Sequence, residues 1–288
     1  MESLTGEALD ARLRELLAED LGQGDVTSEW TVPAEARARG RLIARSACVV
    51  SGLPIARRTF ALLDPDLTWE SEAAAGSSVP PGAALAALSG RARPLLAAER
   101  LALNLLQRMC AIATATRRYV EAVAGTSCRI LDTRKTAPGL RAFDRMAVVD
   151  GGGTNHRNGL DDMVLIKDNH RRLGGGVART VEAARRRAPP GMVVEAEVES
   201  EEDLREALGA GAQRILIDNQ TPETVARWSR IAKESSTPAF IEASGNVTLE
   251  RVRAYALAGA DAVSVGVLTH SVAAADIALE LAPEPEPE

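Results

Sequence analysis

Residues 193–244 read VVEAEVESEEDLREALGAGAQRILIDNQTPETVARWSRIAKESSTPAFIEAS, and they decide the fold of this chain. Three apolar runs, VVEAEV, RILIDN and AFIEAS, are separated by two amphipathic helical patterns. This alternation predicts βαβ units and a parallel sheet, either as a barrel or as a doubly wound sheet. Further runs extend the pattern in both directions: CRILDT (128–133), MVLIKD (163–168) and AVSVGV (262–267).

Polar residues stand near the carboxyl end of each successive run. They are Asp132 with Arg134 and Lys135, Lys167 with Asp168, Glu197, Asp218, Glu242 with Ser244, and Gly266. A parallel α/β barrel places its catalytic groups at this end of its strands. We therefore favour a barrel, which need not be complete, over a doubly wound sheet.

The part of the chain before Gly125 has a different rhythm. Leucines recur at helical spacing from Leu9 to Leu17 after a candidate cap at Thr5, which predicts an opening helix. Short β-like runs between positions 41 and 90 are separated by Pro and Gly turns, which predicts a small sheet domain. A long helical pattern from Pro94 to Gly125 is expected to link the two domains.

Composition narrows the functional class. A chain of 288 residues suits one large domain plus a smaller one. The net charge of −6 and the aromatic content of 3% argue against nucleic-acid binding, which needs a basic face and stacking platforms. The N-terminal segment has no apolar signal core, and no apolar run approaches the ~20 residues of a membrane span, so we expect a cytosolic protein. Cys48, Cys110 and Cys128 have no CxxC spacing and are predicted to be small core residues.

Residues 132–170 concentrate cations and glycine runs. The candidate anchors are Arg134 with Lys135, Arg157 with the adjacent His156, and Lys167, with few competing acids. Arginine grips carboxylate or phosphate through paired hydrogen bonds, and lysine offers a compact charge. The pattern therefore favours a small substrate with several negative charges. The alternative is a set of solvated surface charges with a structural histidine among them.

Two acids inside apolar runs point to a cation site. Glu197 and Asp218 lie where burial of an unpaired charge is costly, so each needs a cation, and Mg²⁺ is the candidate. Glu195 and Glu199 share the face of Glu197 in a regular strand, so the choice among these three glutamates stays open.

The loops after the last two runs are candidates for phosphate binding. Ser244-Gly245 and Gly266 could offer backbone N–H groups at a helix N-terminus, and barrels commonly place a phosphate at this pair of loops. Two ordinary turns are the alternative.

Several blocks run in a recognisable order over nearly the whole chain. They are EDLGQGDVTS (19–28), AERLALNLLQRMCAIATATRRYVEAV (98–123), ILDTRKTAPGLRA (130–142), GGGTNHRNGL (151–160), LIKDNH (165–170), EAEVES (195–200), LIDN (216–219), IEASG (241–245) and VSVGVLTHS (263–271). Together they closely resemble the quinolinate phosphoribosyltransferases, also called nicotinate-nucleotide pyrophosphorylases. The order DTRKT.PGLR, NHR, LIKDNH is highly specific to that family.

The resemblance implies a fold and a reaction. The fold is that of type II phosphoribosyltransferases, with an N-terminal α/β sandwich domain over residues 1–112 and an incomplete, seven-stranded parallel α/β barrel over residues 113–271. A C-terminal helix over residues 272–288 would return to the N-terminal domain. In the implied reaction, quinolinate and phosphoribosyl pyrophosphate give nicotinate mononucleotide, CO₂ and pyrophosphate with Mg²⁺, a step of de novo NAD synthesis.

The resemblance also implies residue roles. The carboxylates of quinolinate would be held by Arg134, Arg157 and Lys167, helped by His156 and by Arg100 from a partner subunit of a homodimer or a multiple of dimers. Lys135 would reach towards phosphoribosyl pyrophosphate, and Glu197 and Asp218 would bind the ribose hydroxyls and the metal. The phosphate groups would lie against Ser244, Gly245, Gly266 and His270.

Some positions depart from the family pattern and leave alternatives open. The departures are Cys110, Ala111, Asn246, Val267 and Val149. They leave room for a member of the same family that ribosylates another aromatic acid in a specialised pathway. A different phosphate-binding barrel enzyme would not need a second cluster of cations. A catalytically silent binding protein would be expected to lose some of the charged residues, all of which are present.

Overall fold

The computed structural model describes residues 6–284 and divides into two compact units. Unit 1 contains residues up to Arg117, together with Ala137–Gly152 and the segment from Ser271 onward. Unit 2 contains Arg118–Thr136 and Gly153–His270. Residues 137–152, expected in the barrel, thus group with unit 1, because Phe143, Ala147 and Val148 pack in a core of that unit.

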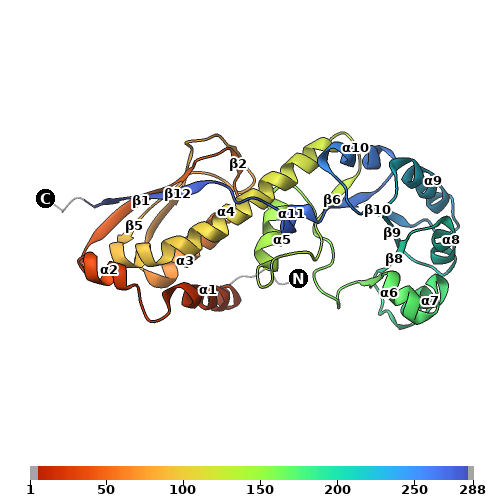
Figure 1. The fold of residues 1–288 in the computed structure, drawn as a ribbon, viewed down its shortest axis with the longest axis horizontal. Helices are drawn as coiled ribbons and strands as arrows, with labels where there is room; N and C mark the ends of the chain where they lie inside the picture. Colours follow the sequence, from red (N-terminus) through yellow and green to blue (C-terminus); the bar gives the residue numbers. More distant parts are fainter. Residues whose placement is uncertain (1–5, 285–288) are drawn as a thin grey trace. The chain divides into compact units, whose positions relative to one another are not determined.

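Unit 1 is built around a four-stranded antiparallel sheet (Figure 1). Its order is β12 (Ile277–Pro283), β1 (Arg37–Ala44), β5 (Ala84–Arg91) and β3 (Thr68–Ser71). Exposure alternates along most of β1, so one face of this strand is buried and the other is not. Strands β2 (Cys48–Val49) and β4 (Ser78–Val79) form a separate pair.

Helices precede the strands of unit 1 or lie between them along the chain, and most of them contribute with the strands to two apolar clusters. The helices are α1 (Gly6–Leu21), α2 (Val26–Thr31), α3 (Leu53–Leu63), α5 (Arg141–Asp150) and all but the end of α4 (Ala92–Ala122). Helix α1 confirms the predicted opening helix, and α4 confirms the long helical pattern, while the candidate cap Thr5 lies outside the described residues. The three cysteines are buried, as predicted.

The C-terminal helix expected over residues 272–288 is wrong. Within that segment, residues 277–283 form strand β12, which pairs antiparallel with β1. The run IALELAP places Ile277, Leu279 and Leu281 on one face of a strand. Ile277 belongs to the apolar cluster that contains Leu42 and Leu85 of the sheet, and Leu279 and Leu281 pack against this cluster. Proline at 283 also cannot donate to a helical ladder. Residues 285–288 lie outside the described part of the chain.

Unit 2 contains six parallel strands in the order β6-β11-β10-β9-β8-β7. They are β6 (Arg129–Leu131), β7 (Val164–Ile166), β8 (Val194–Val198), β9 (Arg214–Asp218), β10 (Phe240–Ser244) and β11 (Ala262–Ser264). All six predicted strands are confirmed. In the described residues, the seventh strand of the expected barrel is reduced to one parallel bridge between Leu131 and Thr154.

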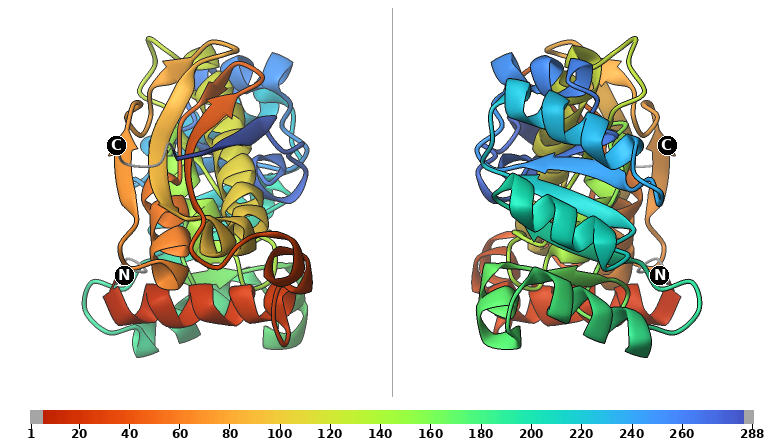
Figure 2. Two further views of the ribbon diagram at one scale, coloured as in Figure 1. Left: turned by 90° about the vertical axis from the view of Figure 1, so that its left-hand side faces the viewer. Right: turned by 90° about the vertical axis from the view of Figure 1, so that its right-hand side faces the viewer.

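Helices follow the strands of unit 2 and cover the outer side of the sheet (Figures 1 and 2). They are α6 (Asp168–Gly174), α7 (Val177–Arg187), α8 (Glu201–Gly209), α9 (Pro222–Lys233) and α10 (Leu249–Leu257), while the short α11 (Val267–His270) follows β11 and is not one of these outer helices. Caps begin two of them: Ser200 accepts the N–H of Asp203 in α8, and Thr221 accepts the N–H of Thr224 in α9.

The strand register aligns charged residues at successive levels of one face of the unit 2 sheet. Glu195 pairs with Arg214, and Glu197 with Leu216, across β8 and β9. Glu242 of β10 pairs with that same Leu216, and Ser244 pairs with Asp218. Because side chains alternate along a strand, these positions share a face.

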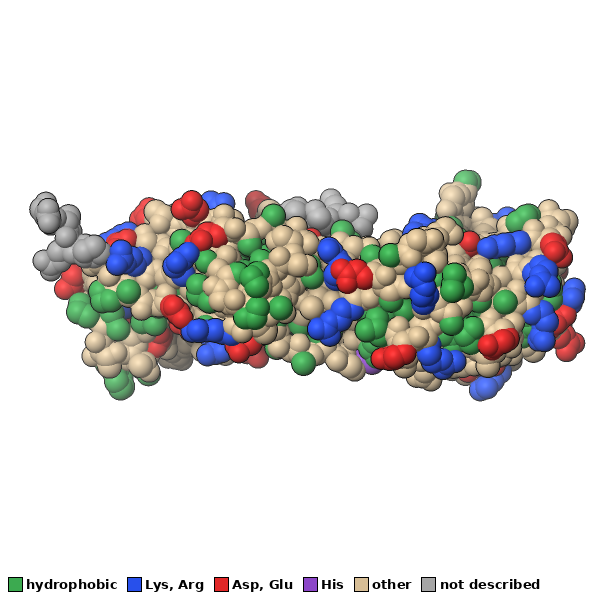
Figure 3. Space-filling view, turned by 90° about the horizontal axis from the view of Figure 1, so that it is seen from above, with side chains coloured by type: hydrophobic (Ala, Val, Ile, Leu, Met, Phe, Trp, Pro, Cys, Tyr) green, Lys and Arg blue, Asp and Glu red, His purple; other side chains and the backbone are tan. Residues whose placement is uncertain are grey.

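Charges on the visible surface are mixed. In the view of Figure 3, acidic and basic side chains are interspersed rather than gathered by sign. Within residues 6–284, none of the helices combines the length and apolar character that a bilayer crossing requires.

Candidate active site

A cavity of about 620 Å³ opens at the carboxyl ends of the unit 2 strands. Most of the predicted site residues line it: Arg134, Lys135, His156, Arg157, Lys167, Glu197, Asp218, Ser244 and Gly245. Their strands are parallel and in register, so residues that are far apart in sequence meet at one edge of the sheet. The lining is richly charged, which suits an anionic ligand better than an apolar one.

Two arginines, Arg134 and Arg157, face the cavity. Arg157 donates from Nη1 to the carbonyl of Met163 at 3.1 Å, and Arg134 has a buried Nε without a hydrogen-bond partner among the described residues. Burial, and then the like charge of Arg134, lower the pKa of Arg157. An anion placed between the two guanidinium groups would relieve this repulsion.

Lys167 has an acidic partner, which corrects the expectation of few competing acids. Its Nζ lies 3.3 Å from Oε2 of Glu197. Burial raises the pKa of Asp218, although Lys167 and Lys135 act in the opposite direction. The acids of this strand edge, Glu197 and Asp218, are therefore balanced by lysines of the same cavity.

Three carboxylates at the cavity form a set of oxygen donors. Oxygens of Glu197, Glu199 and Asp218 lie within 4.8 Å of one another. Hard oxygen ligands suit Mg²⁺, which is usually held by one or two carboxylates together with water and phosphate oxygens, so two of these three acids would be enough. The donor chemistry fits a divalent cation.

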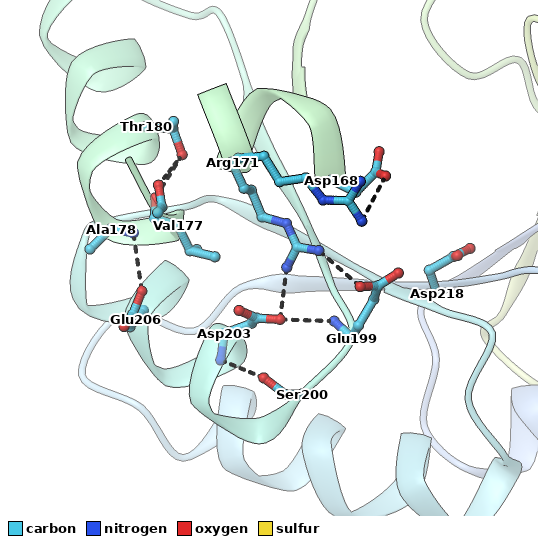
Figure 4. A network of polar contacts seen from close by, with 12 residues as sticks. Asp168, Arg171, Val177, Ala178, Thr180, Glu199, Ser200, Asp203, Glu206 and Asp218 are labelled. Atoms are coloured by element: carbon cyan, nitrogen blue, oxygen red, sulfur yellow. Dashed lines mark hydrogen bonds and ion pairs between the residues drawn. The ribbon is translucent and has the colours of Figure 1, made fainter. Parts of the chain in front are cut away.

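Arg171 of α6 holds Glu199, one of these three acids (Figure 4). Its guanidinium lies 3.1 Å from Glu199 and 2.7 Å from Asp203, and Asp203 also accepts the backbone N–H of Glu199 at 3.3 Å. The side chain of Arg171 is largely buried. Sequence reasoning missed this residue, because an arginine on a helix gives no sign of which loop it reaches.

The turn after β10 requires a glycine at position 245. Its φ is +92°, and a Cβ there would lie 2.7 Å from the backbone nitrogen of Asn219. Asn219 and Asn246 also adopt positive φ, and the amide of Asn246 donates to Oδ1 of Asn219 at 3.3 Å. Asparagine tolerates this conformation, so Asn246 keeps the turn while adding an amide to the cavity lining.

Lys135, Gly266 and His270 lie together beside the cavity. A Cβ on Gly266 would come within 3.1 Å of the His270 ring and 3.2 Å of Cδ of Lys135. Thr269 donates from Oγ1 to the carbonyl of Lys135 at 2.8 Å. The structure therefore brings these predicted residues together, although neither Gly266 nor His270 is part of the cavity lining.

Arg100 does not line the cavity. It is an exposed residue of α4 and belongs to unit 1. The charge of Arg100 acts on Glu99, whose pKa is nevertheless raised by burial.

Behind the cavity lies a buried charged network that the sequence did not reveal. Nε2 of His156 lies 3.3 Å from Oε2 of Glu195 and 3.3 Å from Oε2 of Glu242. Arg214 bonds Glu242 at 2.5 Å and lies 3.4 Å from Glu195. Both glutamates are fully buried. The available signal was the alternation of glutamates in VVEAEV with an arginine at the start of the next strand.

Burial and pairing act differently on the two glutamates. Burial raises the pKa of Glu195, and the adjacent charge of Glu242 raises it further. Burial also opposes ionisation of Glu242, but His156 and Arg214 outweigh it and lower the pKa of that carboxyl. Glu242 is therefore the charged partner of Arg214 in the network.

His156, Glu195 and Glu242 have the composition of a metal site, but Arg214 already supplies the cation. Donor atoms of the three residues lie within 4.8 Å of one another. The guanidinium of Arg214 bonds Glu242 and lies 3.4 Å from Glu195. We therefore assign this cluster as an ion network of the chain itself.

Unit 1 has a groove of its own, with a volume of about 940 Å³, on its antiparallel sheet. Three of the five charged residues in its lining have ion pairs within unit 1: Arg41 lies 2.9 Å from Glu72, and Glu280 and Glu284 pair with Arg45 and Arg37.

Both parts of the chain match models of one family. Residues 25–110 match the N-terminal domain of quinolinate phosphoribosyl transferase, and residues 112–280 match its C-terminal domain. The chain belongs to the quinolinate phosphoribosyltransferase family. This confirms the resemblance drawn from the sequence blocks.

Individual members of the quinolinate phosphoribosyltransferase family are similar over nearly their whole length. The probable nicotinate-nucleotide pyrophosphorylase [carboxylating] of Bacillus subtilis is 40% identical over 271 residues, covering 93% of this chain and 92% of that protein. The nicotinate-nucleotide pyrophosphorylase [carboxylating] of Mycobacterium leprae is 40% identical over 279 residues, covering 93% and 95%.

Solved structures of the family share the fold. NadC from Streptococcus pyogenes superposes with a TM-score of 0.92 at 34% identity, covering 99% of this chain and 100% of that one. The nicotinate-nucleotide pyrophosphorylase from Francisella tularensis gives 0.89 at 33% identity, covering 97% and 98%. The predicted fold class, an incomplete α/β barrel with an N-terminal α/β sandwich domain, is confirmed.

Proposed function

We propose that this protein transfers the phosphoribosyl group of phosphoribosyl pyrophosphate to quinolinate with loss of CO₂, giving nicotinate mononucleotide and pyrophosphate for NAD synthesis. The observation that carries the proposal is the cavity of unit 2, where cations and carboxylates gather at the strand ends of a family member. Quinolinate is a dianion, and the sugar substrate is a polyanion.

The cations and the acids of the cavity take different parts. Arg134, Arg157 and Lys167 would hold the quinolinate carboxylates, because two arginines and a lysine offer several charge-assisted hydrogen bonds. Lys135 would approach the phosphoribosyl pyrophosphate. Ser244, Gly245, Gly266 and His270 would receive phosphate groups.

Glu197 and Asp218 would bind the ribose hydroxyls and hold Mg²⁺, with Glu199 as a third oxygen donor. The cation, when bound, supplies charge neutralisation for the departing pyrophosphate. Depletion of divalent cations with a chelator is expected to abolish turnover, and added Mg²⁺ is expected to restore it.

The reaction needs positioning and electrostatics more than covalent catalysis. The pyridine nitrogen attacks the anomeric carbon as the bond to pyrophosphate breaks. The resulting pyridinium stabilises the electron pair left on the adjacent ring carbon when CO₂ departs, and that carbon then takes a proton. The chain orients the acid against the sugar and surrounds the reacting atoms with fixed charge.

An ultraviolet assay tests this function. Quinolinate, phosphoribosyl pyrophosphate and Mg²⁺ are incubated with the protein beside nicotinate, phthalate and other pyridine carboxylates. Turnover of quinolinate well above that of nicotinate is expected, because two carboxylates engage more of the cations. Preference for another acid would identify a paralogue with a different substrate, the alternative that Asn246 in the cavity lining leaves open.

We also propose that Arg100 serves the site of a second copy in a homodimer. Inactive Arg100→Ala and inactive Lys135→Ala proteins, once mixed, are expected to regain activity, because one hybrid site contains both wild-type residues. Subunit exchange without regained activity would contradict a shared site.

A further inference from the structure

His156 lines the cavity with both ring nitrogens engaged by the protein. Nδ1 accepts the backbone N–H of Arg157 at 2.7 Å, and Nε2 lies 3.3 Å from each of two buried carboxylates. The side chain is only 7% exposed. A neutral imidazole has one acceptor and one donor nitrogen, and both are used here. No ring nitrogen remains to grip a substrate carboxylate.

The protonation of the ring is set by two opposing groups. Burial disfavours a charge on the ring and acts to lower the pKa of His156, whereas the carboxylates of Glu195 and Glu242 act in the opposite direction. The N–H of Arg157 opposes a second proton, because a nitrogen that accepts a hydrogen bond carries none. The hydrogen bond at Nδ1 therefore assigns a neutral ring, with its single proton on Nε2, which faces the carboxylates.

We propose that His156 is a positioning residue that acts through Arg157, and that Glu195, Glu242 and Arg214 form the buried frame that fixes its ring. The inference rests on the proposed function, since its consequence is the affinity for the acid substrate. It replaces direct contact between His156 and that acid with an indirect role.

A chain of contacts leads from the barrel to Arg157. The backbone N–H of His156 donates to Oδ1 of the buried Asp132 at 2.7 Å. The ring of His156 then holds the backbone N–H of Arg157, whose guanidinium reaches the carbonyl of Met163. The orientation of the ring therefore decides where the Arg157 backbone lies, and with it the guanidinium in the cavity.

The frame that holds this ring spans neighbouring strands. Glu195 is on β8, Glu242 is on β10, and Arg214 lies on β9 between them. The guanidinium of Arg214 stacks over the ring of Phe240 at 4.5 Å, and Glu242 also bonds Ser264 of β11.

Such a frame is costly to bury. Barrel interiors are normally filled by branched apolar side chains. Buried ion pairs rarely stabilise a protein more than apolar packing of the same volume would. Departures from the apolar rule cluster at functional sites, and here the departure lies directly beneath the cavity.

Two substitutions of His156 separate the indirect role from direct contact. Asn places an amide oxygen near the position of Nδ1 and keeps an acceptor for Arg157, whereas Gln reaches the position of Nε2 and loses that acceptor. His156→Asn is expected to retain acid affinity within about threefold, and His156→Gln to lose roughly tenfold, the effect of one charge-assisted contact. The reverse order would overturn the proposal.

A double-mutant cycle gives an independent answer. His156→Gln is combined with Arg157→Ala, and the Kd of the acid is measured by calorimetry. If His156 acts only through Arg157, its substitution changes the Kd less than about twofold once Arg157 is Ala. Equal losses in both backgrounds would mean that His156 contacts the acid itself.

Glu242→Gln tests the frame. The variant is expected to raise the KM for the acid severalfold and to leave the KM for phosphoribosyl pyrophosphate unchanged. Glu202→Gln, which neutralises an exposed acid of α8, is the matched control and should change neither. Equal changes in both KM values would contradict a positioning role. If thermal unfolding shows that Glu242→Gln does not fold, Arg214→Lys replaces it.

The ring state can also be observed directly. The chain has three histidines, so ¹⁵N NMR can follow His156 by comparison with His156→Asn. A proton on Nε2 that persists when the acid binds supports the proposal, and a change of tautomer or charge on binding contradicts it.

Wild-type measurements separate this inference from the proposed function. A wild type that does not turn over quinolinate contradicts the function alone, and the variants are then compared with whichever acid of the panel binds. If no aromatic acid binds to the wild type, both proposals fail.

Discussion

The two units treat buried charge in different ways. In unit 1, the buried Asp144 accepts two hydrogen bonds from Arg108, at 2.7 and 2.8 Å. The buried Asp64 likewise accepts the backbone N–H and Nε of Arg91, at 2.7 and 3.0 Å. In unit 2, by contrast, Lys167 and Glu197 of the cavity approach each other only to 3.3 Å, and Arg134 keeps a buried nitrogen without a hydrogen-bond partner in the described chain.

This difference separates charges that hold the fold from charges that await a ligand. A carboxylate that receives two good hydrogen bonds from one arginine has little capacity left for a third party. Loosely matched charges keep capacity for a substrate and strengthen when it binds. We call a fully hydrogen-bonded pair such as Arg108 and Asp144 a closed pair, and the loosely matched charges of the cavity an open cluster. Substitutions in a closed pair should change stability, and substitutions in the open cluster should change ligand binding.

Breaking a closed pair should give the largest change. Arg108→Met leaves Asp144 buried without its cation and is expected to lower the free energy of unfolding by about 3 kcal/mol. A urea titration followed by tryptophan fluorescence, to which Trp30 and Trp69 of unit 1 contribute, measures the loss. Arg57→Met, at an exposed position of α3, is the control and should stay within about 0.5 kcal/mol. Equal stabilities of the two variants would show that the closed pair of Arg108 and Asp144 does not stabilise the fold more than an exposed charge does.

Removing one cation from the open cluster of the cavity should change the affinity for the acid rather than the stability of the fold. Lys167→Met is expected to weaken acid binding by roughly 10- to 100-fold, the cost of about 1.5 to 3 kcal/mol for a charge-assisted contact. Its stability should change little, because Lys167 is half exposed. The affinity for phosphoribosyl pyrophosphate should fall much less. Lys233→Met removes a lysine elsewhere in unit 2 as the control, and similar kinetics for both variants would argue against the assignment.

Lowering the pH should weaken the closed pair of Asp64 and Arg91. Burial alone would raise the pKa of Asp64, but the backbone and side chain of Arg91 lower it below the usual value. A depressed pKa contributes stability above the unfolded value of about 4, and this contribution is lost as the pH falls through the folded value.

The comparison with Asp64→Asn isolates that contribution. The variant is expected to be less stable than the wild type by about 1 to 2 kcal/mol at pH 7. The difference in free energy of unfolding between the wild type and the variant should become smaller below about pH 4, as the wild-type carboxyl takes up a proton. Urea titrations between pH 3 and 7 measure it, and a gap that is constant over this range would mean that the charge of Asp64 contributes nothing.

The smallest effect is expected at the turn after β10. Asn246 has a φ of +49°, a conformation that glycine adopts without strain. Asn246→Gly should therefore change the free energy of unfolding by no more than about 0.5 kcal/mol and leave turnover of quinolinate intact. Asn246→Ala loses both the amide and the tolerance of positive φ, so it should be the less stable of the two by thermal unfolding.

Local patterns in the sequence predicted the elements that their own residues determine. The six strands of unit 2 and helices α1 and α4 depend on short-range periodicity, and they were predicted correctly. Because parallel strands end at one edge, the positions of Lys167, Glu197 and Asp218 at a common cavity could also be anticipated.

The parts that could not be predicted depend on contacts between distant segments. Glu195 and Glu242 meet through Arg214 on the strand between them, a relation that exists only once the strand order is known. The alternation in IALELAP is compatible with a strand, but its partner, the open edge of β1, lies more than 200 residues earlier and cannot be identified from the residues near position 280. The roles of Arg100 and the metal remain proposals.

The pairing of β12 with β1 has a consequence during synthesis. Ala44 at the end of β1 pairs with Ile277 at the start of β12. Ribosomes add residues at about 5 to 20 per second, so β1 waits roughly 10 to 50 s for this partner. Throughout that time one edge of the unit 1 sheet is unpaired and open to other chains. The strands and helices of unit 2 emerge before the sheet closes, and the part of the protein that is made first is therefore the last to be completed.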